Sequence, residues 1–318
     1  MGLLFGARLN PYADVTLIGR WPDQIAALRA GPLQVITPGQ RTRRIALHAT
    51  DDLRTVGPVE LALIVTKTPR TAAAAADAAQ VLAPDGLAIS LQNGLGSDVI
   101  LAGVLGVERV TRGVTTLGAS TRGQAGRLYP GGEGTTTLAT RPAIDARLRA
   151  IAALFQRAGL DTQLTTDINA LIWGKLAINA AINPISAILR MPNGPLLESG
   201  WTRDLMRQAA YEVAAVAAAQ AITLPFEDAA DQAIEVARQT AYNQSSMLQD
   251  VQRGAPTEID AICGAVVRAG AEHDVPTPVN RTLYELVKAL EVSGGLQADG
   301  LQALLMGRGT FNQDWQTR

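Results

Sequence analysis

Short, almost unbroken apolar runs separated by a helical segment constrain the fold of the first half of the chain. The runs are Val15-Thr-Leu-Ile18, Leu61-Ala-Leu-Ile-Val65 and Leu87-Ala-Ile-Ser-Leu91. Parallel strands that are covered on both faces show this pattern. An alanine-rich helix is predicted over Thr71–Leu82, between the second and third runs, and should close at Pro84-Asp-Gly86. This βαβ order predicts an α/β domain built on a doubly wound, Rossmann-like sheet.

Two further β segments interrupt this order. Residues Leu33–Ile36 and Arg44–His48, joined across Pro38-Gly39, predict an inserted hairpin. Glycine-punctuated β patterning over Gly123–Thr140 predicts a second hairpin, before a helix at Ala143–Ala158.

The pattern changes after Asp167, where glycine-bounded strands give way to long helical windows. We therefore expect two domains, a Rossmann-like α/β domain over 1–165 and an all-helical domain over 166–318. The tail from Ser293 to Arg318 is glycine-rich at first and predicts nothing. The helical windows are Ile168–Ile182, Trp201–Ala219, Phe226–Gln249, Thr257–His273 and Val279–Leu290.

Composition excludes several classes of protein. Of the 318 residues, 47% are hydrophobic and 18% charged, with a net charge of -1, so global charge predicts neither a nucleic-acid partner nor a membrane partner. No window reaches the roughly 18 uninterrupted apolar residues of a membrane span. Cys263 stands alone and cannot form an internal disulfide, which fits a reducing cytoplasm. With only His48 and His273, neither a metal site nor a Ser-His-Asp triad is expected.

A polar stripe crosses an otherwise apolar helical window between Leu171 and Pro184. Lys175, Asn179 and Asn183 recur every four residues and so share one helix face. Burying an ammonium and two amides without partners costs several kcal/mol. The stripe therefore predicts a polar ligand or a wet cleft, and the alternative is a stripe that simply faces solvent.

Other polar groups fit the same ligand. Asn243 and Ser246 lie three residues apart and are expected on one helical face. Glu258 follows Thr257, a possible helix cap, and would lie in the first helical turn, where an acidic residue also suits the helix dipole. An ammonium, several amides, a hydroxyl and a carboxylate together suit a small, oxygen-rich acid.

Asn93 connects this set to the sheet. The segment Gln92-Asn-Gly94 follows the run that ends at Leu91, which places Asn93 at a carboxyl end of the sheet, where open α/β sheets bind ligands. The alternative is an ordinary Asn-Gly turn.

Six segments in this order resemble the ketopantoate reductase family, which pairs a Rossmann domain with a helical domain like that of 6-phosphogluconate dehydrogenase. The resemblance extends from about Asp14 to Leu290. Its segments are Gln92-Asn-Gly94, Trp173-Gly-Lys-Leu-Ala-Ile-Asn-Ala-Ala-Ile-Asn-Pro184, Pro192-Asn-Gly194, Ser245-Ser-Met-Leu-Gln-Asp250, Thr257-Glu-Ile-Asp260 and Val275-Pro-Thr-Pro278.

The resemblance implies NADP(H)-dependent reduction of 2-dehydropantoate to pantoate, a step toward pantothenate and coenzyme A. It makes Lys175 the catalytic acid and Glu258 a carboxylate that orients a small 2-keto acid. The residues implied to line the substrate and nicotinamide pocket are Asn93, Asn179, Asn183, Asn193, Asn243 and Ser246.

Two basic residues bear on the cofactor. Arg20 follows the run ending at Ile18, where NAD-selective domains usually carry an acidic residue, and an arginine there suits the 2′-phosphate of NADP. Lys67, just past Val65, matches a lysine of the family pattern. Each could instead be an ordinary surface base.

The N-terminus departs from the family. The start Met1-Gly-Leu-Leu-Phe-Gly-Ala-Arg-Leu9 resembles the family's first helix from the third glycine of the phosphate-binding loop onward, which makes Gly2 that glycine. The family's first strand is central in the sheet and is absent from this sequence. The two strands that would flank it should therefore lack ladder partners on that side. We hypothesise that Met1 is an internal methionine of a longer natural chain, which an intact mass would test. If Met1 is instead the true start, NADPH should bind poorly, because the pyrophosphate loses the backbone amides of the glycine loop. The Gly131-Gly-Glu-Gly134 segment is expected to be a turn and not a substitute loop.

Two alternatives remain at this point. The chain could be a paralogue that reduces another 2-keto acid, or a non-catalytic remnant with impaired nucleotide binding. Whether the helical domain forms a homodimer stays open, because helix patterning does not distinguish an interface from a core.

Overall fold

The computed structural model describes residues 1–292 and divides into two compact units, Met1–Lys175 and Leu176–Arg318. The domain boundary near Thr165 stays a prediction. The tail from Ser293, for which the sequence predicted nothing, lies outside the described residues.

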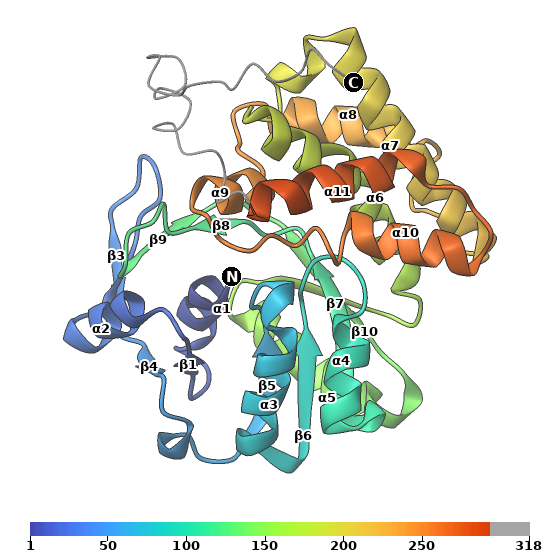
Figure 1. The fold of residues 1–318 in the computed structure, drawn as a ribbon. Helices are drawn as coiled ribbons and strands as arrows, with labels where there is room; N and C mark the ends of the chain where they lie inside the picture. Colours follow the sequence, from blue (N-terminus) through green and yellow to red (C-terminus); the bar gives the residue numbers. More distant parts are fainter. Residues whose placement is uncertain (293–318) are drawn as a thin grey trace, which may run out of the picture. The chain divides into compact units, whose positions relative to one another are not determined.

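A mixed five-stranded sheet forms the centre of the first unit, with the order β11-β10-β7-β6-β5 (Figure 1). Strands β5, β6 and β7 run parallel, and β10 is antiparallel to β7. The elements of this unit are α1 (Gly2–Leu9), β1 (Thr16–Ile18), α2 (Pro22–Ala30), β2 (Leu33–Val35), β3 (Arg43–Ile45), β4 (His48–Thr50), η1 (Leu53–Thr55), β5 (Val59–Ile64), η2 (Thr68–Arg70), α3 (Thr71–Val81), β6 (Leu82–Ser90), α4 (Ser97–Leu105), η3 (Val107–Arg109), β7 (Val110–Thr115), β8 (Ala119–Ser120), β9 (Arg127–Pro130), β10 (Thr135–Ala139), η4 (Pro142–Ile144), α5 (Asp145–Arg157) and β11 (Asp161–Thr165).

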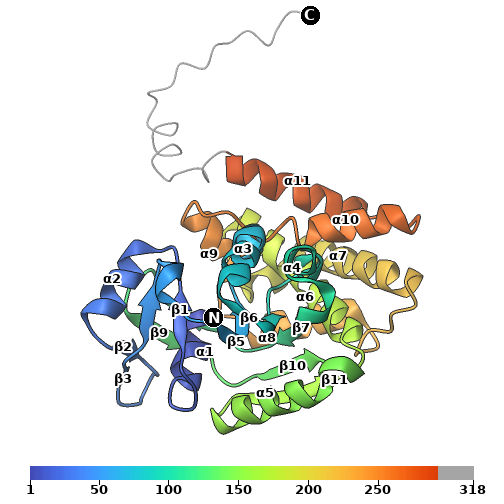
Figure 2. The same ribbon diagram turned by 90° about the horizontal axis from the view of Figure 1, so that it is seen from below.

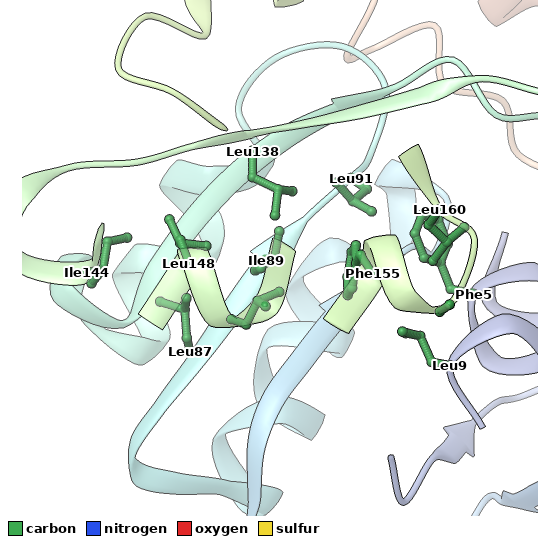
Figure 3. Close-up of a cluster of buried hydrophobic side chains, with 12 residues drawn as sticks. Phe5, Leu9, Leu87, Ile89, Leu91, Leu138, Ile144, Leu148, Phe155 and Leu160 are labelled. Carbon is green, nitrogen blue, oxygen red and sulfur yellow. The ribbon is translucent and has the colours of Figure 1, made fainter. Parts of the chain in front are cut away.

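Helices cover both faces of this sheet, as the nearly continuous apolar strands predict (Figure 2). Leu87 and Ile89 of β6 pack with Phe155 of α5 (Figure 3). The ring centroids of Phe155 and of Phe5 in α1 lie 5.8 Å apart. Ala88, on the opposite face of the same strand, packs with residues of α3 and α4. The doubly wound architecture is therefore confirmed.

The parallel strands are interrupted between β1 and β5. Among the described residues, β1 pairs only with β4 and β5 only with β6, so no ladder joins β1 to β5. Helix α1 contacts both sides of the interruption: a Cβ on Gly6 would lie 2.9 Å from Leu17 of β1, and one on Gly2 would lie 3.7 Å from Val65, just past β5. The prediction that two neighbouring strands lack ladder partners is confirmed within these residues.

A four-stranded sheet with the order β3-β2-β9-β8 completes the first unit. The first predicted hairpin is confirmed as β2 and β3, but His48 does not belong to it, because His48 pairs with Thr16 in the parallel β1–β4 ladder. The predicted Gly123–Thr140 hairpin is wrong. Strands β9 and β10 pair in different sheets, and the chain crosses between them where the Gly131 amide donates to the Gly118 carbonyl at 2.8 Å.

The end of one helix and the beginning of the next strand differ from the prediction. Helix α3 ends at Val81, and β6 begins directly at Leu82, so Pro84-Asp-Gly86 lies within the strand segment instead of closing the helix. Gly86 is needed there, because a Cβ would lie 2.9 Å from the carbonyl oxygen of Val59 on the adjacent strand.

All regular secondary structure in the described part of the second unit is helical. Two predicted windows are too long. Phe226–Gln249 is divided by a turn into α8 and α9, and the window from Thr257 begins its helix only at Cys263. The helices are α6 (Asn169–Leu189), which starts in the first unit, η5 (Pro195–Leu197), α7 (Gly200–Ala219), α8 (Ala229–Gln239), α9 (Ser246–Gln252), α10 (Cys263–Glu272) and α11 (Pro278–Val292).

Helix α6 is the most apolar long helix of the described chain. Its length and mean hydropathy of 1.3 would allow a membrane span, but 72% of that window is buried inside the protein. A buried core helix shows the same combination, so α6 gives no argument for a membrane.

Candidate active site

The carboxyl ends of β5, β6 and β7 meet at one edge of the five-stranded sheet, because these strands are parallel. The segments that leave this edge carry Lys67 after β5 and Asn93 after β6, and both side chains are half-buried. This is the edge at which open α/β sheets bind ligands.

Lys175 reaches the same edge from α6. Its Nζ donates a hydrogen bond to the carbonyl oxygen of Thr115, the last residue of β7, at 2.6 Å. The side chain is therefore half-buried against the sheet and does not extend into bulk solvent. An ammonium has three N–H donors, and this carbonyl takes one of them.

The start of α6 is fixed to the sheet by polar contacts, which sets the position of Lys175. The Asp167 carboxylate accepts a hydrogen bond from the Asn169 amide at 3.1 Å and caps the helix. The Arg112 guanidinium, on β7, donates to the side-chain oxygen of Asn169 and lies 3.3 Å from the Asp98 carboxylate of α4. Arg112 thus connects β7, α4 and α6.

Gln92 fixes the two loops that carry Lys67 and Asn93. Its Nε2 donates to the Thr66 carbonyl and to the Thr71 hydroxyl, both at 3.0 Å. Its Oε1 accepts from the Ser90 hydroxyl at 3.2 Å. Next to Asn93, Gly94 has a φ of 78°, a value that glycine adopts without the cost that a Cβ adds.

The beginning of α1 also lies at this edge, near Lys67. Burial, with a contribution from the charge of Lys67, lowers the pKa of the Met1 α-amino group from its ordinary value of 8.0. The first amides of α1, that of Gly2 among them, lie near the ammonium of Lys67. A helix N-terminus with basic neighbours favours anions.

Arg20 follows β1 and is engaged in an ion pair. Its Nη2 lies 2.6 Å from the Asp77 carboxylate of α3, and half of its side chain is exposed. The guanidinium thus remains at the surface next to a single carboxylate.

The stripe on α6 is not a solvent-facing stripe. Asn183 is buried, with 8% of its surface exposed, and Lys175 and Asn179 are half-buried. The three residues lie in one continuous helix, at positions that share a face.

Asn193 and Asn243 are brought together in the second unit. The backbone N–H of Asn193 donates to the backbone carbonyl of Asn243 at 3.0 Å, and the side-chain Nδ2 of Asn193 donates to the Thr240 hydroxyl at 2.8 Å. Asn193 is buried, and its side-chain oxygen has no hydrogen-bond partner within residues 1–292. An unsatisfied buried acceptor costs about 1–3 kcal/mol unless a donor reaches it.

The expectation that Asn243 and Ser246 share a helical face is wrong. Asn243 lies in the turn after α8 and is exposed, whereas Ser246 is the first residue of α9. The reason is Ser245, whose hydroxyl accepts from the Leu248 amide at 3.0 Å and so begins a new helix.

Glu258 is placed differently from the prediction. It lies in turns before α10, and not in a first helical turn, because the Thr257 hydroxyl accepts from the Ile259 amide in a local turn. Glu258 is 4% exposed, whereas an acidic residue that served only the helix dipole would face solvent.

The segment that carries Glu258 is held by α11. The Glu291 carboxylate accepts from both the amide and the hydroxyl of Thr257, each at 2.7 Å. Lys288 lies 2.8 Å from Glu291 and 3.0 Å from Asp260, and these carboxylates raise its pKa.

The predicted residues of the first unit therefore converge only in part. Lys67, Asn93, Lys175 and the start of α1 at Gly2 share the carboxyl edge of the five-stranded sheet, and Arg20 follows β1 in the separate pair of strands. The positioning residues that the sequence did not single out are Gln92, Arg112, Thr115, Asp167 and Glu291. Of these, only Gln92 lay within a segment already noticed, next to Asn93.

Comparison with known proteins gives consistent matches. The family model described as ketopantoate reductase PanE/ApbA matches residues 1–143, and the model of its C-terminal domain matches residues 167–291. A 2-dehydropantoate 2-reductase of Halobacterium salinarum is 34% identical over 299 residues, 92% of this chain and 96% of the relative. One of Archaeoglobus fulgidus is 35% identical over 294 residues, 92% and 95% of the two chains.

Solved structures agree with these matches. A PanE/ApbA family ketopantoate reductase from Ralstonia eutropha superposes with a TM-score of 0.83 at 30% identity, covering 91% of this chain and 95% of the other. A D-mandelate dehydrogenase with NADH and anilino(oxo)acetate gives 0.84 at 25% identity, covering 92% and 95%. By sequence and by fold, the chain belongs to the ketopantoate reductase family.

Proposed function

We propose that this chain reduces 2-dehydropantoate to pantoate with NADPH, and that Lys175 is the catalytic acid. The observation that carries the proposal is the position of Lys175, whose ammonium is bonded to Thr115 at the carboxyl edge of the parallel strands. Relatives named 2-dehydropantoate 2-reductase, similar over nine-tenths of the chain, support the same reaction.

The residues at this edge fit a nicotinamide dinucleotide. The start of α1 at Gly2 and the ammonium of Lys67 would hold the pyrophosphate, and Asn93 would lie beside the nicotinamide. Arg20 would hold the 2′-phosphate of NADP. Because Arg20 already pairs with Asp77, the phosphate must share or replace that carboxylate.

The chemistry assigned to the chain is proton transfer and charge stabilisation. The bound cofactor supplies a hydride to the keto carbon of the substrate. Negative charge then develops on the former keto oxygen, and Lys175 stabilises it and donates one Nζ proton to it. The bond to Thr115 orients the ammonium, and Lys175 recovers its proton from solvent after the product leaves.

Substrate binding is assigned to the remaining polar groups. Asn179 is half-buried and Asn183 is buried, so each of these amides requires a polar partner, and the buried carboxylate of Glu258 belongs to the same unit. The buried oxygen of Asn193 fits a hydroxyl donor. We assign the carboxylate and the primary alcohol of 2-dehydropantoate to these groups, with Asn243 and Ser246 as further ligands. A site that hydrogen-bonds this alcohol should reject keto acids that lack it.

A second candidate is the reduction of another 2-keto acid. The likeness to a D-mandelate dehydrogenase favours it, because that protein acts on a different 2-hydroxy acid and was solved with NADH. An aromatic keto acid would not need the hydroxyl acceptor that we assign to Asn193.

NADPH oxidation by the 318-residue chain tests both candidates. It is measured with 2-dehydropantoate, with 2-ketoisovalerate, with phenylglyoxylate and without substrate. Turnover at least about 100-fold faster with 2-dehydropantoate than with 2-ketoisovalerate supports the first candidate. Comparable turnover of all three acids, or preference for phenylglyoxylate, supports the second. No turnover and no change in NADPH fluorescence would contradict both.

A further inference from the structure

One part of the first unit carries positive charge without any carboxylate. Residues 31–50 and 116–132, which form β2, β3, β4, β8 and β9, contain five arginines and neither aspartate nor glutamate. These arginines are Arg41, Arg43, Arg44, Arg122 and Arg127.

Three polar side chains of this region lie in register across three strands. Gln34 of β2 is paired with Arg44 of β3 on one side and with Arg127 of β9 on the other. Residues in register share a face of the sheet, and adjacent strands lie about 4.8 Å apart. The row therefore places one guanidinium group on each side of the Gln34 side-chain amide. The opposite face is the buried core of this region, with Leu33 and Leu128 almost fully covered.

The row lines a pocket of about 410 Å³. The wall beside it is formed by the end of α2, with Ala27, Ala30 and Gly31, and by Gly126. A second hollow of about 870 Å³, lined by Gln34 and residues 41–44, also includes Arg44. Both volumes lie in the range of small-molecule sites, about 300–1,000 Å³.

The arginines of this row differ from several other arginines of the same unit, which pair with carboxylates. Arg20, Arg29, Arg54 and Arg149 each pair with an aspartate. Arg127 donates only to the neutral side chain of Gln124, at 2.9 Å. Arg41, Arg43 and Arg44 have no carboxylate partner within residues 1–292. The positive charge at the pocket is therefore not neutralised by the described chain.

We propose that the Arg44–Gln34–Arg127 row is a binding site for a small molecule that carries two or more phosphate groups. Guanidinium groups bind phosphate oxygens with paired hydrogen bonds, and two of them flanking an amide suit adjacent phosphates. The pocket wall favours a small ligand over a long polyanion.

This site is separate from the cofactor residues. Arg20 lies before the N-terminus of α2, whereas the pocket lies at its C-terminus. Nine helical residues separate these ends by about 13 Å. The proposal therefore stands whether or not the proposed function holds.

Titration of the full chain with sodium tripolyphosphate tests the site. Calorimetry at physiological ionic strength should show binding that saturating NADPH does not displace. Arg44→Ala and Arg127→Ala should each weaken it at least about tenfold, or 1.4 kcal/mol. Arg147→Ala, which removes an exposed arginine of α5, is the matched control and should change the affinity less than about twofold.

Several results would overturn the proposal. These are no binding at about 10 mM probe, variants that bind as tightly as the unmodified chain, displacement by NADPH, or binding of polynucleotides but not of tripolyphosphate. If a variant fails to fold, modification of the native chain by phenylglyoxal replaces it. Tripolyphosphate should then protect Arg44 and Arg127 but not Arg147, as mass spectrometry would show, and equal labelling of all three would refute the site.

Discussion

Arg20 is the residue to which we assign the choice between NADPH and NADH. Its guanidinium is half-exposed and bonded to Asp77 at 2.6 Å, so it is held at the surface after β1. Arg20→Ala should raise the KM for NADPH at least about tenfold, because a charge-assisted contact to the 2′-phosphate is lost. The KM for NADH should stay within about twofold.

Arg29→Ala is the matched control for this substitution, since Arg29 also forms an exposed pair with an aspartate, at 2.8 Å. It should leave both KM values unchanged. Equal changes for the two cofactors in Arg20→Ala would remove Arg20 from the phosphate site.

At the scale of elements, Glu212 of α7 holds the beginning of α11. Its carboxylate accepts from the amides of Val279 and Asn280 and from the Asn280 side chain, each at 2.8 Å. Glu212→Ala leaves these donors without the acceptor and should lower the free energy of unfolding by about 2 kcal/mol.

Urea unfolding of the variant measures this change, and hydrogen exchange of the Val279 and Asn280 amides should accelerate. Glu285→Ala, on the exposed side of α11, should change stability by less than about 0.5 kcal/mol. Unchanged exchange at the two amides would show that Glu212 does not hold α11.

The N-terminus of α1 predicts how stability depends on pH in the 318-residue chain. Burial, and secondarily the charge of Lys67, lowers the pKa of the Met1 amino group below 8.0 in the folded state. Between the folded pKa and 8.0 the unfolded chain binds the proton and the folded chain does not. Stability should therefore rise with pH up to about 8, by at most about 1.4 kcal/mol per pH unit, and then level off.

Thermal unfolding between pH 6 and 9 measures this dependence, and Lys67→Gln should reduce the rise without abolishing it. A Tm that stays constant or falls between pH 7 and 8 would contradict the assignment.

The sequence predicted elements well where one local pattern decides them. The apolar runs at residues 61–65 and 87–91 became β5 and β6, and α6 carries the predicted stripe of Lys175, Asn179 and Asn183. Prediction from the sequence failed where a single side chain ends a periodic pattern. Ser245 begins α9 and so separates Asn243 from Ser246, although periodicity alone continues through both.

Across the whole molecule, the errors concern pairing over long sequence separations. Strands β9 and β10 follow each other closely, yet β9 pairs with β2 and β10 with β7 and β11. His48 follows the hairpin but pairs with Thr16 of β1. Apolar alternation defines which face of a strand is buried and contains no information on its neighbour. The hydrogen bond between Lys175 and Thr115 could not be predicted for the same reason, since it joins residues that only the folded sheet brings together.

The turnover number of Lys175→Ala with NADPH and 2-dehydropantoate tests the central claim most directly. We predict a fall in kcat of at least about 100-fold, the usual contribution of a general acid, with the Kd for NADPH unchanged. Lys175→Arg should also be slow, because a guanidinium retains its proton. A kcat within about threefold of the unmodified chain would contradict the assignment of Lys175 as the acid.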